Sequence, residues 1–241
     1  MDLRLAGHHA LVTGGSSGIG AAIAGTLAGE GCGVLVHGRD AAAAAAVAEQ
    51  VAARGVRAEV VLGDLTEPGV AEEVAVTARG FGARILVNNA GPFTGHDWDS
   101  SGPADWRAAF EGNVLPTVRV TQTLLPSLRQ HGWGRVITIG TRALRTPPPD
   151  AAVCSAARAA MVNMTTSLAH HLAGTGVTAN CVSPGVIVMD EERVDGSAGE
   201  RSRRPGRPED IAAAVAYLAS PLADYVNGIE LRVDGGAAGA P

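Results

Sequence analysis

Two side chains that could do chemistry lie one helical turn apart in the stretch DAAVCSAARAAM, residues 150–161. Cys154 offers a thiol whose ordinary pKa of about 8.5 suits a proton donor, and the guanidinium of Arg158 favours the thiolate form. Cys154 could therefore act as an acid or as a covalent nucleophile. A nucleophile usually needs a neighbouring base, and no histidine lies in this stretch. The alternative is that Cys154 is a small apolar residue that fills space on a helix face.

The bulk composition favours a soluble α/β protein and excludes several other classes. Of the 241 residues, 46% are hydrophobic and 18% are charged, which supplies enough apolar material for a sizeable core. The net charge of −5 argues against a nucleic-acid or membrane-surface binder. Three cysteines without framework spacing suggest free thiols in a reducing compartment, and no apolar run predicts a signal peptide or a membrane span. We therefore expect a cytoplasmic protein.

Short β-branched runs alternate with helical stretches along the whole chain. The expected strands lie at residues 9–14, 33–38, 57–64, 83–91, 134–140, 176–185 and 228–236. The expected helices lie at residues 18–31, 40–54, 68–79, 103–112, 113–130, 150–173 and 208–220. Apolar strands separated by helices predict a parallel sheet with helices on both faces. Because no linker or repeat interrupts this pattern, residues 1–241 are predicted to form a single doubly wound, Rossmann-type α/β domain.

A glycine-rich segment, TGGSSGIG at residues 13–20, connects the first strand to the first helix. Gly14 permits the tight turn, Gly18 lets a diphosphate approach, and Gly20 allows close packing of helix on strand. The N–H groups and partial positive charge of the helix N-terminus then face the anion. The alternative is an ordinary tight turn, but the flanking strand and helix favour a dinucleotide site.

The end of the second strand, VHGRD, indicates which dinucleotide is preferred. NAD(H) is usually held by an acidic side chain at this place, where the present chain has Gly38. Arg39 follows and suits the additional phosphate of NADP(H), while Asp40 is expected to cap the next helix. The sequence therefore favours NADP(H) over NAD(H); the alternative is that Arg39 is a solvated loop charge. Asp64 ends the third strand, where it could accept a hydrogen bond from the adenine amine.

Together with motifs further along, these features resemble the short-chain dehydrogenase/reductase family. The motifs are TGGSSGIG, NNAG at 88–91, Asn113 in FEGNVLP, GRVITIG, SPG at 183–185, and GRPEDIAAAVAYLAS followed by VDGG. They occur in the family's order across nearly the whole chain. The resemblance implies a sheet of about seven strands and a homodimer or homotetramer formed through the helices at 113–130 and 150–173. The residues expected to bind the cofactor are Gly14, Ser16, Ser17, Gly18, Ile19, Gly20, Arg39, Asp64, Leu65, Asn89, Ala90, Gly91, Arg158, Pro184, Gly185 and Ile187.

The resemblance also places the family's catalytic residues on this chain. The family uses an Asn, a Ser after the fifth strand, and a Tyr-x-x-x-Lys on the next helix; the Tyr exchanges a proton with the substrate oxygen. Here Asn113 and Thr141 occupy the first two places, whereas Cys154 and Arg158 stand at the Tyr and Lys places. Met189 stands where the family has a Thr that holds the carboxamide. The catalytic candidates are therefore Asn113, Thr141, Cys154 and Arg158.

These substitutions limit the chemistry that the site can perform. A Cys sulfur lies roughly 4 Å short of a Tyr oxygen from the same Cα. Arg158 can donate to ribose hydroxyls or phosphate, but it cannot relay protons because it does not deprotonate in proteins. Thr141 either faces the substrate or bonds local backbone, and Asn113 is either catalytic or structural.

The loop after NNAG is expected to border the substrate. His96 could supply a proton near neutral pH, with Asp97 and Asp99 beside it, although a solvated loop is the alternative. Phe93 and Trp98 could form an aromatic wall.

The segment after SPG stands where the family has a substrate lid. It is short, charged and interrupted by glycine. Arg201, Arg203 and Arg204 could accept a bulky or anionic substrate there, and a solvated loop is again the alternative.

Hydride transfer chiefly needs a correctly positioned nicotinamide. General acid catalysis typically raises the rate by about 10²–10⁴-fold, and another proton source can take the place of the family's tyrosine. The favoured function is therefore an atypical NADP(H)-dependent oxidoreductase. Its substrate would be a small quinone, enone or polycyclic aromatic ketone that takes its proton from water or from its own phenol. The alternatives are a non-redox enzyme, such as a cyclase, dehydratase or isomerase, and a cofactor-binding pseudoenzyme subunit. No metal, nucleic acid or membrane is predicted as a partner.

Overall fold

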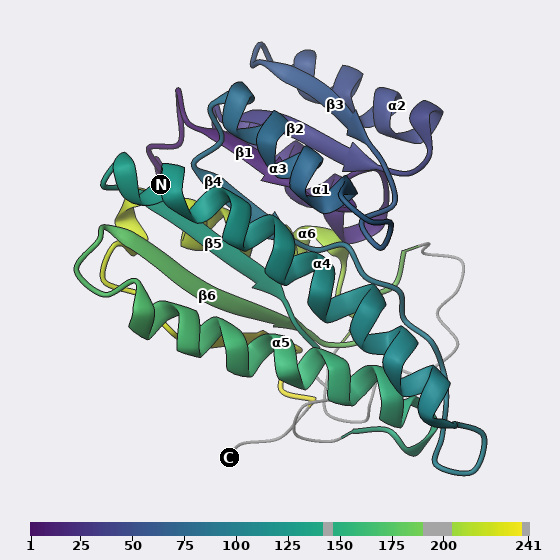
Figure 1. Ribbon diagram of the computed structural model, residues 1–241. Coiled ribbons are helices and arrows are strands. Elements are labelled where there is room, and N and C mark those ends of the chain that lie inside the picture. The colour runs from purple at the N-terminus through teal and green to yellow at the C-terminus, as the bar shows by residue number, and fades with distance from the viewer. Residues whose placement is uncertain (142–146, 190–203, 238–241) are drawn as a thin grey trace.

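The computed structural model describes residues 1–141, 147–189 and 204–237, and its centre is one parallel β-sheet (Figure 1). The sheet has seven strands in the order β3-β2-β1-β4-β5-β6-β7. The strands are β1 (His9–Val12), β2 (Gly33–Gly38), β3 (Ala58–Leu62), β4 (Ile85–Asn88), β5 (Gly134–Ile139), β6 (Val177–Pro184) and β7 (Glu230–Val233). The doubly wound fold predicted from the alternating pattern is confirmed.

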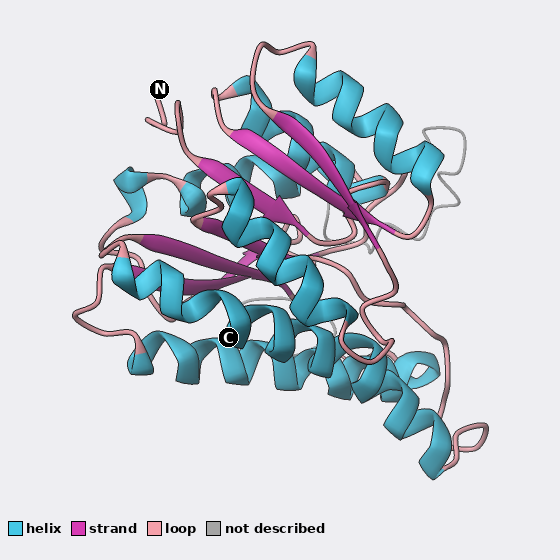
Figure 2. Ribbon diagram, turned by 45° about the horizontal axis from the view of Figure 1, so that its top comes forward, coloured by secondary structure: helices cyan, strands magenta, loops and turns pink. Residues whose placement is uncertain are grey.

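Helices cover both faces of this sheet (Figure 2). The helices are α1 (Gly18–Gly29), α2 (Ala41–Ala52), α3 (Val70–Phe81), α4 (Pro103–Gln130), α5 (Ala152–His171) and α6 (Pro208–Ala219), with short 3-10 helices at Pro149–Ala151 and Pro221–Ala223. Helices α1, α2 and α6 share one apolar core with the sheet, and α3, α4 and α5 share another on the opposite face. All six residues of β2 are buried because helices cover both of its faces.

The strand order reverses beside β1, which lies between β2 and β4. The chain runs from β1 through β2 to β3 on one side of β1 and then crosses back to β4 on its other side, so a crevice opens where the carboxyl ends of β1 and β4 meet. The glycine-rich segment follows β1, and Asn89–Gly91 follow β4. Topology thus brings together two motifs about 75 residues apart, as the hydrogen bond from Asn89 to Gly14 shows.

Helix α4 corrects one prediction, because the sequence suggested two helices that meet at residues 112 and 113. The structure has one continuous helix with Pro116 inside it. Proline removes a backbone donor, which normally weakens a helix. Side chains near Pro116 add hydrogen bonds to the helix: the amide of Asn113 donates to the Ala109 carbonyl at 3.0 Å, and the Thr117 hydroxyl donates to the Asn113 carbonyl at 3.0 Å. Packing of α4 against α3 and α5 then keeps the helix continuous.

The helix cap predicted at the start of α2 agrees with the structure. Asp40 caps α2, and its carboxylate accepts the Ala43 N–H at 3.0 Å, as predicted. Of the helices built from described residues, none is both long and apolar enough to cross a membrane.

Candidate active site

A cavity of about 1090 Å³ lies at the carboxyl ends of the strands and runs from the glycine-rich turn to α5. Most predicted site residues line it. Those that do are Gly14, Ser16, Ser17, Gly18, Ile19, Gly20, Arg39, Asp64, Leu65, Asn89, Ala90, Gly91, Thr141, Arg158, Pro184, Gly185 and Ile187. Asn113 and Cys154 do not belong to this lining. The fold therefore gathers residues from several strand ends around one space that is large enough for a dinucleotide.

The glycine-rich turn is built so tightly that side chains would block it. Gly14 has φ +62°, a conformation that favours glycine. A Cβ on Gly20 would collide with the Gly14 carbonyl and lie 2.7 Å from the Asn89 amide nitrogen. Helix α1 begins at Gly18, and Ser17 caps it without a side-chain hydrogen bond. The first-turn N–H groups and the helix dipole are thus directed at the place where a diphosphate would bind.

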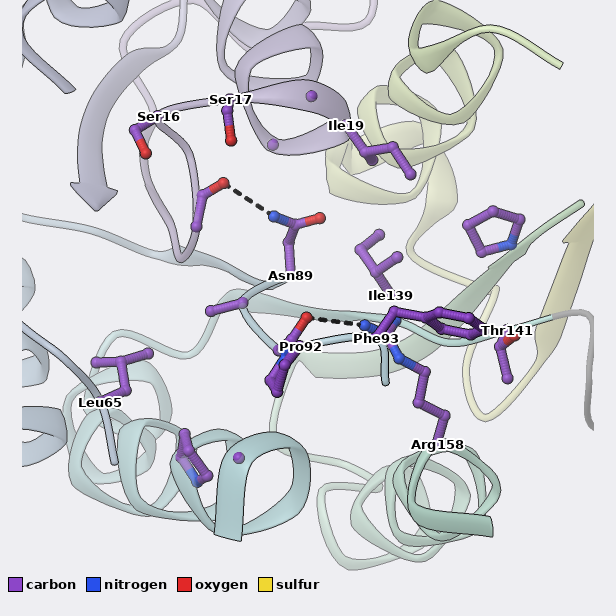
Figure 3. A pocket seen from close by; sticks show the side chains of 18 of the residues that line it. Ser16, Ser17, Ile19, Leu65, Asn89, Pro92, Phe93, Ile139, Thr141 and Arg158 are labelled. Carbon is purple, nitrogen blue, oxygen red and sulfur yellow. Dashed lines mark hydrogen bonds between the residues drawn. The ribbon is translucent and has the colours of Figure 1, made fainter. Parts of the chain in front are cut away.

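Residues from β1 and β4 hold this turn in place. The Thr13 hydroxyl accepts the Asn89 N–H at 2.9 Å and donates to the Val87 carbonyl at 3.1 Å. The Asn89 side-chain amide donates to the Thr13 carbonyl at 3.0 Å and to the Gly14 carbonyl at 3.1 Å. Figure 3 shows Asn89 directed at the turn. This network fixes the backbone that would face the cofactor.

The strand ends near Arg39 form a charged rim. A Cβ on Gly38 would lie 2.6 Å from the Ser16 hydroxyl oxygen, so a side chain there would displace Ser16. Arg39 is 78% exposed at its side chain and lies 3.4 Å from the Asp64 carboxylate. Hydrogen bonds from Thr66, followed by the interaction with Arg39, lower the pKa of Asp64 below its ordinary value. Asp64 therefore remains ionised and orients Arg39 at the rim.

Cys154 and Arg158 on α5 have different surroundings: Cys154 is buried outside the cavity, whereas Arg158 lines it. Cys154 is fully buried, and its sulfur faces the Pro92 carbonyl at 3.7 Å. This placement favours the interpretation of Cys154 as an apolar filler over that of a nucleophile, because a buried thiol outside the cavity cannot reach a substrate. Arg158 reaches into the cavity and donates to the Gly91 carbonyl at 3.1 Å and to the Gly140 carbonyl at 3.2 Å (Figure 3).

Arg158 thereby joins the ends of β4 and β5. The ion pairs among the described residues do not include Arg158, and its Nε is buried without a hydrogen-bond partner. A guanidinium held by neutral carbonyls retains its positive charge at the cavity wall. It can therefore stabilise negative charge that develops on a bound substrate.

Asn113 lies behind the cavity wall. It is 1% exposed, and its side-chain oxygen has no hydrogen-bond partner. A Cβ on Gly91 would lie 2.5 Å from that oxygen, so Asn113 contacts the backbone that lines the cavity. The hydrogen bond from its side-chain amide within α4 supports the structural role of Asn113, whereas Thr141, the other candidate, lines the cavity.

The substrate end is less polar than the sequence suggested. Phe93 lines the cavity, whereas His96, Asp97 and Asp99 do not. Asp97 accepts the Ser100 N–H at 2.6 Å, as in a surface turn. Trp98 packs on Trp106 of α4, with ring centroids 5.4 Å apart, so it supports the loop instead of lining the cavity.

The lid prediction falls largely on residues outside the described ranges, including Arg201 and Arg203. Arg204 is described, and it forms an ion pair with Asp210 at 2.7 Å, which accounts for its charge without an anionic substrate. Met189 lines the cavity and lies against Gly18; its sulfur would be 3.3 Å from a Cβ there.

Sequence reasoning missed several residues at this site, and three of them have polar side chains with a clear place in it. Thr13 anchors the turn, His37 contacts the turn from β2, and Glu111 places a carboxylate on the cavity wall. Of the three, only His37 could have been recognised from the sequence, because it is a titratable residue in the otherwise apolar strand GVLVHG.

The glycine-rich turn, the strand order and the cavity are those of a Rossmann-type dinucleotide-binding fold. The chain belongs to the short-chain dehydrogenase family, whose model matches residues 8–195. The 3-oxoacyl-[acyl-carrier-protein] reductase FabG of Escherichia coli (strain K12) is 35% identical over 239 residues, covering 95% of this chain and 97% of the relative.

Solved structures show the same similarity. The L-sorbose reductase from Gluconobacter frateurii, complexed with NADPH and L-sorbose, matches with a TM-score of 0.93 and 28% identity over the full length of both chains. A 3-oxoacyl (acyl-carrier-protein) reductase from Agrobacterium tumefaciens C58 with NADP bound matches with a TM-score of 0.91 and 33% identity, covering 97% of this chain and 95% of that chain.

Proposed function

We propose that this protein is an NADP(H)-dependent reductase of activated carbonyl compounds that works without the family's tyrosine acid. The observation that carries the proposal is the contrast between the two ends of the cavity. The glycine-rich turn has the close approaches that a dinucleotide requires, whereas Cys154 is buried at the place where the family has its proton donor. The site thus has the features that bind a dinucleotide but lacks the tyrosine that donates the proton in this family.

The composition indicates that the family's catalytic Tyr and Lys have not moved to other positions at the site. All 19 basic residues counted as Lys or Arg are arginines, so the chain contains no lysine. Its two tyrosines are Tyr217 on α6 and Tyr225 after it, and both lie outside the cavity lining. Neither partner of the family's Tyr–Lys pair has therefore moved to another position at the site.

The cofactor part of the proposal has two supports. Similar proteins were solved with NADPH or NADP, and the turn around Gly14 and Gly20 fits a diphosphate. Arg39 stands at the rim, where the additional phosphate of NADP(H) would be recognised by charge and by the planar guanidinium. When bound, the reduced nicotinamide would supply a hydride to the substrate carbon.

The chain's own residues then have electrostatic roles. Arg158 keeps its charge and can stabilise the oxygen that becomes negative during reduction, next to Thr141 on the same wall. Arg158 cannot give up a proton, so we assign the proton donor to water or to the substrate itself. A quinone, an enone or a polycyclic aromatic ketone suits this site, since its oxygen is already stabilised.

The apolar side of the cavity agrees with such a substrate. Phe93, Pro92 and Ile139 line it close to Arg158. Flat unsaturated rings would contact this surface while the carbonyl oxygen faces Arg158 and Thr141.

The direct test follows loss of NADPH absorbance with a naphthoquinone, an enone and a simple ketone of equal ring size. In the absence of oxygen, which would reoxidise a hydroquinone product, we expect stoichiometric NADPH oxidation with the quinone or enone and a rate lower by about 10²-fold or more with the simple ketone. NADPH that binds but is not consumed by any of them would refute the redox function and favour a non-redox enzyme or a pseudoenzyme subunit.

Cofactor preference gives a separate prediction. Arg39→Gln should weaken NADPH binding by about tenfold or more, because one charge-assisted phosphate contact is lost and Asp64 is left unpaired. Binding of NADH should change little. Fluorescence titration of both cofactors measures this, with Arg54→Gln, an exposed arginine outside the cavity, as the matched control. Equal weakening of NADH and NADPH would show that Arg39 does not recognise the additional phosphate.

We also propose that the protein forms a homo-oligomer through α4 and α5. A second hollow of about 360 Å³ lies between these helices and is lined in part by Leu125, Met164 and Leu168. An apolar hollow on two long neighbouring helices is the kind of surface that a second copy of the chain would cover.

A further inference from the structure

The cofactor turn is held from β2 by a histidine that the proposed reaction does not use. His37 is 2% exposed. Its Nδ1 accepts the Gly14 N–H at 3.1 Å, and its backbone carbonyl accepts the Gly15 N–H at 2.7 Å. One residue therefore binds two consecutive amides at the start of the glycine-rich turn.

The second ring nitrogen of His37 fixes its protonation state. Nε2 lies 3.1 Å from the Gly63 carbonyl oxygen, which can only accept a hydrogen bond. Nε2 must therefore carry the proton, and Nδ1 must be bare to accept from Gly14. Both bonds are satisfied together only by the neutral Nε2–H tautomer. Through this ring, the ends of β2 and β3 are tied to the turn after β1.

The turn has little freedom to adapt if this bond is lost. Asn89 holds the Gly14 carbonyl from the opposite side at 3.1 Å, and Gly14 itself has φ +62°. A Cβ on Gly20 would collide with the same carbonyl, so the position of Gly14 also sets how closely α1 approaches. A displaced Gly14 amide would therefore move the backbone that faces the diphosphate.

Protonation would turn Nδ1 from an acceptor into a donor, directed at the Gly14 N–H. We propose that neutral His37 holds the glycine-rich turn in its cofactor-binding conformation, and that protonation of His37 releases the turn and weakens cofactor binding. This inference rests on the nicotinamide cofactor of the proposed function, but not on the preference for NADP(H) or on the substrate.

The charges around His37 determine the direction of its titration. Among the described residues, those that face it are Arg39 on its own strand end and Asp64 after β3. Burial lowers the pKa of His37 below its ordinary value of 6.5, the Gly63 hydrogen bond and Asp64 oppose this shift, and Arg39 adds to it. The native ring is therefore neutral at neutral pH.

The sign of the pH dependence follows from this lowered pKa. The unfolded chain takes up the proton first, so the stability that neutral His37 contributes is complete above pH 6.5 and is lost as the pH falls from 6.5 toward the lowered pKa. Cofactor affinity should decline in the same direction, as the protonated ring becomes populated.

The experiment measures NADP⁺ binding by calorimetry from about pH 8 to about pH 5 in the wild type and in His37→Asn. The Asn oxygen can replace Nδ1 as the acceptor for Gly14 but does not titrate. We expect wild-type affinity to fall on the order of tenfold more than that of His37→Asn over this range. The 2′-phosphate of NADP⁺ also titrates near pH 6, and it does so equally in both proteins.

Two further measurements keep the outcomes distinct. His37→Leu, which has no acceptor, should bind weakly at every pH. Nitrogen-detected NMR of the wild type should show His37 as the Nε2–H tautomer at neutral pH, which requires no variant to fold. Parallel pH profiles for the wild type and His37→Asn, or an Nδ1–H tautomer, would overturn the inference. Absence of NADP⁺ and NAD⁺ binding at every pH would instead overturn the proposed function.

Discussion

Replacing Cys154 by Tyr and Arg158 by Lys together is expected to raise the reduction rate of a simple ketone by about 10²–10⁴-fold. The two positions are four residues apart on α5, so they lie on one face of the helix. The Cys154 sulfur contacts the carbonyl of Pro92, which itself lines the cavity, and a Tyr oxygen would reach roughly 4 Å further from the same Cα. Lys at 158 would lower the Tyr pKa, a task that needs a nearby positive charge. The measurement is NADPH oxidation with the ketone in excess.

The matched control for this gain is Cys154→Phe with Arg158→Lys. It adds nearly the same volume beside Pro92 but no hydroxyl, so packing changes alone should not raise the rate. Melting temperature and NADPH affinity should be compared for both double variants. If the Tyr–Lys variant folds and binds NADPH as the wild type does, yet still fails to reduce the ketone, then the nicotinamide is not held in a geometry for hydride transfer.

Gly20→Val is expected to abolish cofactor binding, with affinity for NADPH lowered by about 100-fold or more. Its Cβ would collide with the Gly14 carbonyl and would lie 2.7 Å from the Asn89 amide nitrogen. Neither neighbour is a flexible chain end: the carbonyl is backbone, and Asn89 is held by two hydrogen bonds. The turn must therefore open, and the N–H groups at the start of α1 lose their common direction. Fluorescence titration with NADPH measures the loss.

Helix α1 provides the control for this substitution. A Cβ on Gly25 meets nothing within 4 Å. Gly25→Ala should leave NADPH affinity unchanged and should stabilise the fold by about 0.5–1 kcal/mol, since alanine favours a helix more than glycine does. Undiminished NADPH affinity in a folded Gly20→Val variant would contradict the placement of the diphosphate at this turn.

Most of the architecture could be predicted from the sequence, because its signals are local. Apolar runs with short turns between them specify buried parallel strands, whichever strands become neighbours. Gly14 marks its turn because only glycine adopts φ near +62° without strain, and Asp40 caps α2 through a bond to an amide three residues away. These features depend on backbone sterics and on nearby residues, so they can be recognised before the fold is known. The division of α4 at residues 112 and 113 was wrong, because one helix runs from Pro103 to Gln130 and its packing against α3 and α5 is not contained in any local pattern.

The chemistry of the site was decided by contacts between distant segments. His37 gains its role only because β2 lies beside β1 and β3, which brings Gly14 and Gly63 to its two ring nitrogens. Arg158 bonds Gly91, 67 residues away, because the carboxyl ends of β4 and β5 meet in front of α5. The sequence alone therefore determined the fold, through backbone preferences and hydrophobic periodicity, and predicted the end of the sheet at which a cofactor would bind. Tertiary structure decided which side chains are buried, paired or exposed to a substrate, because strand order and register set distances that no local pattern contains.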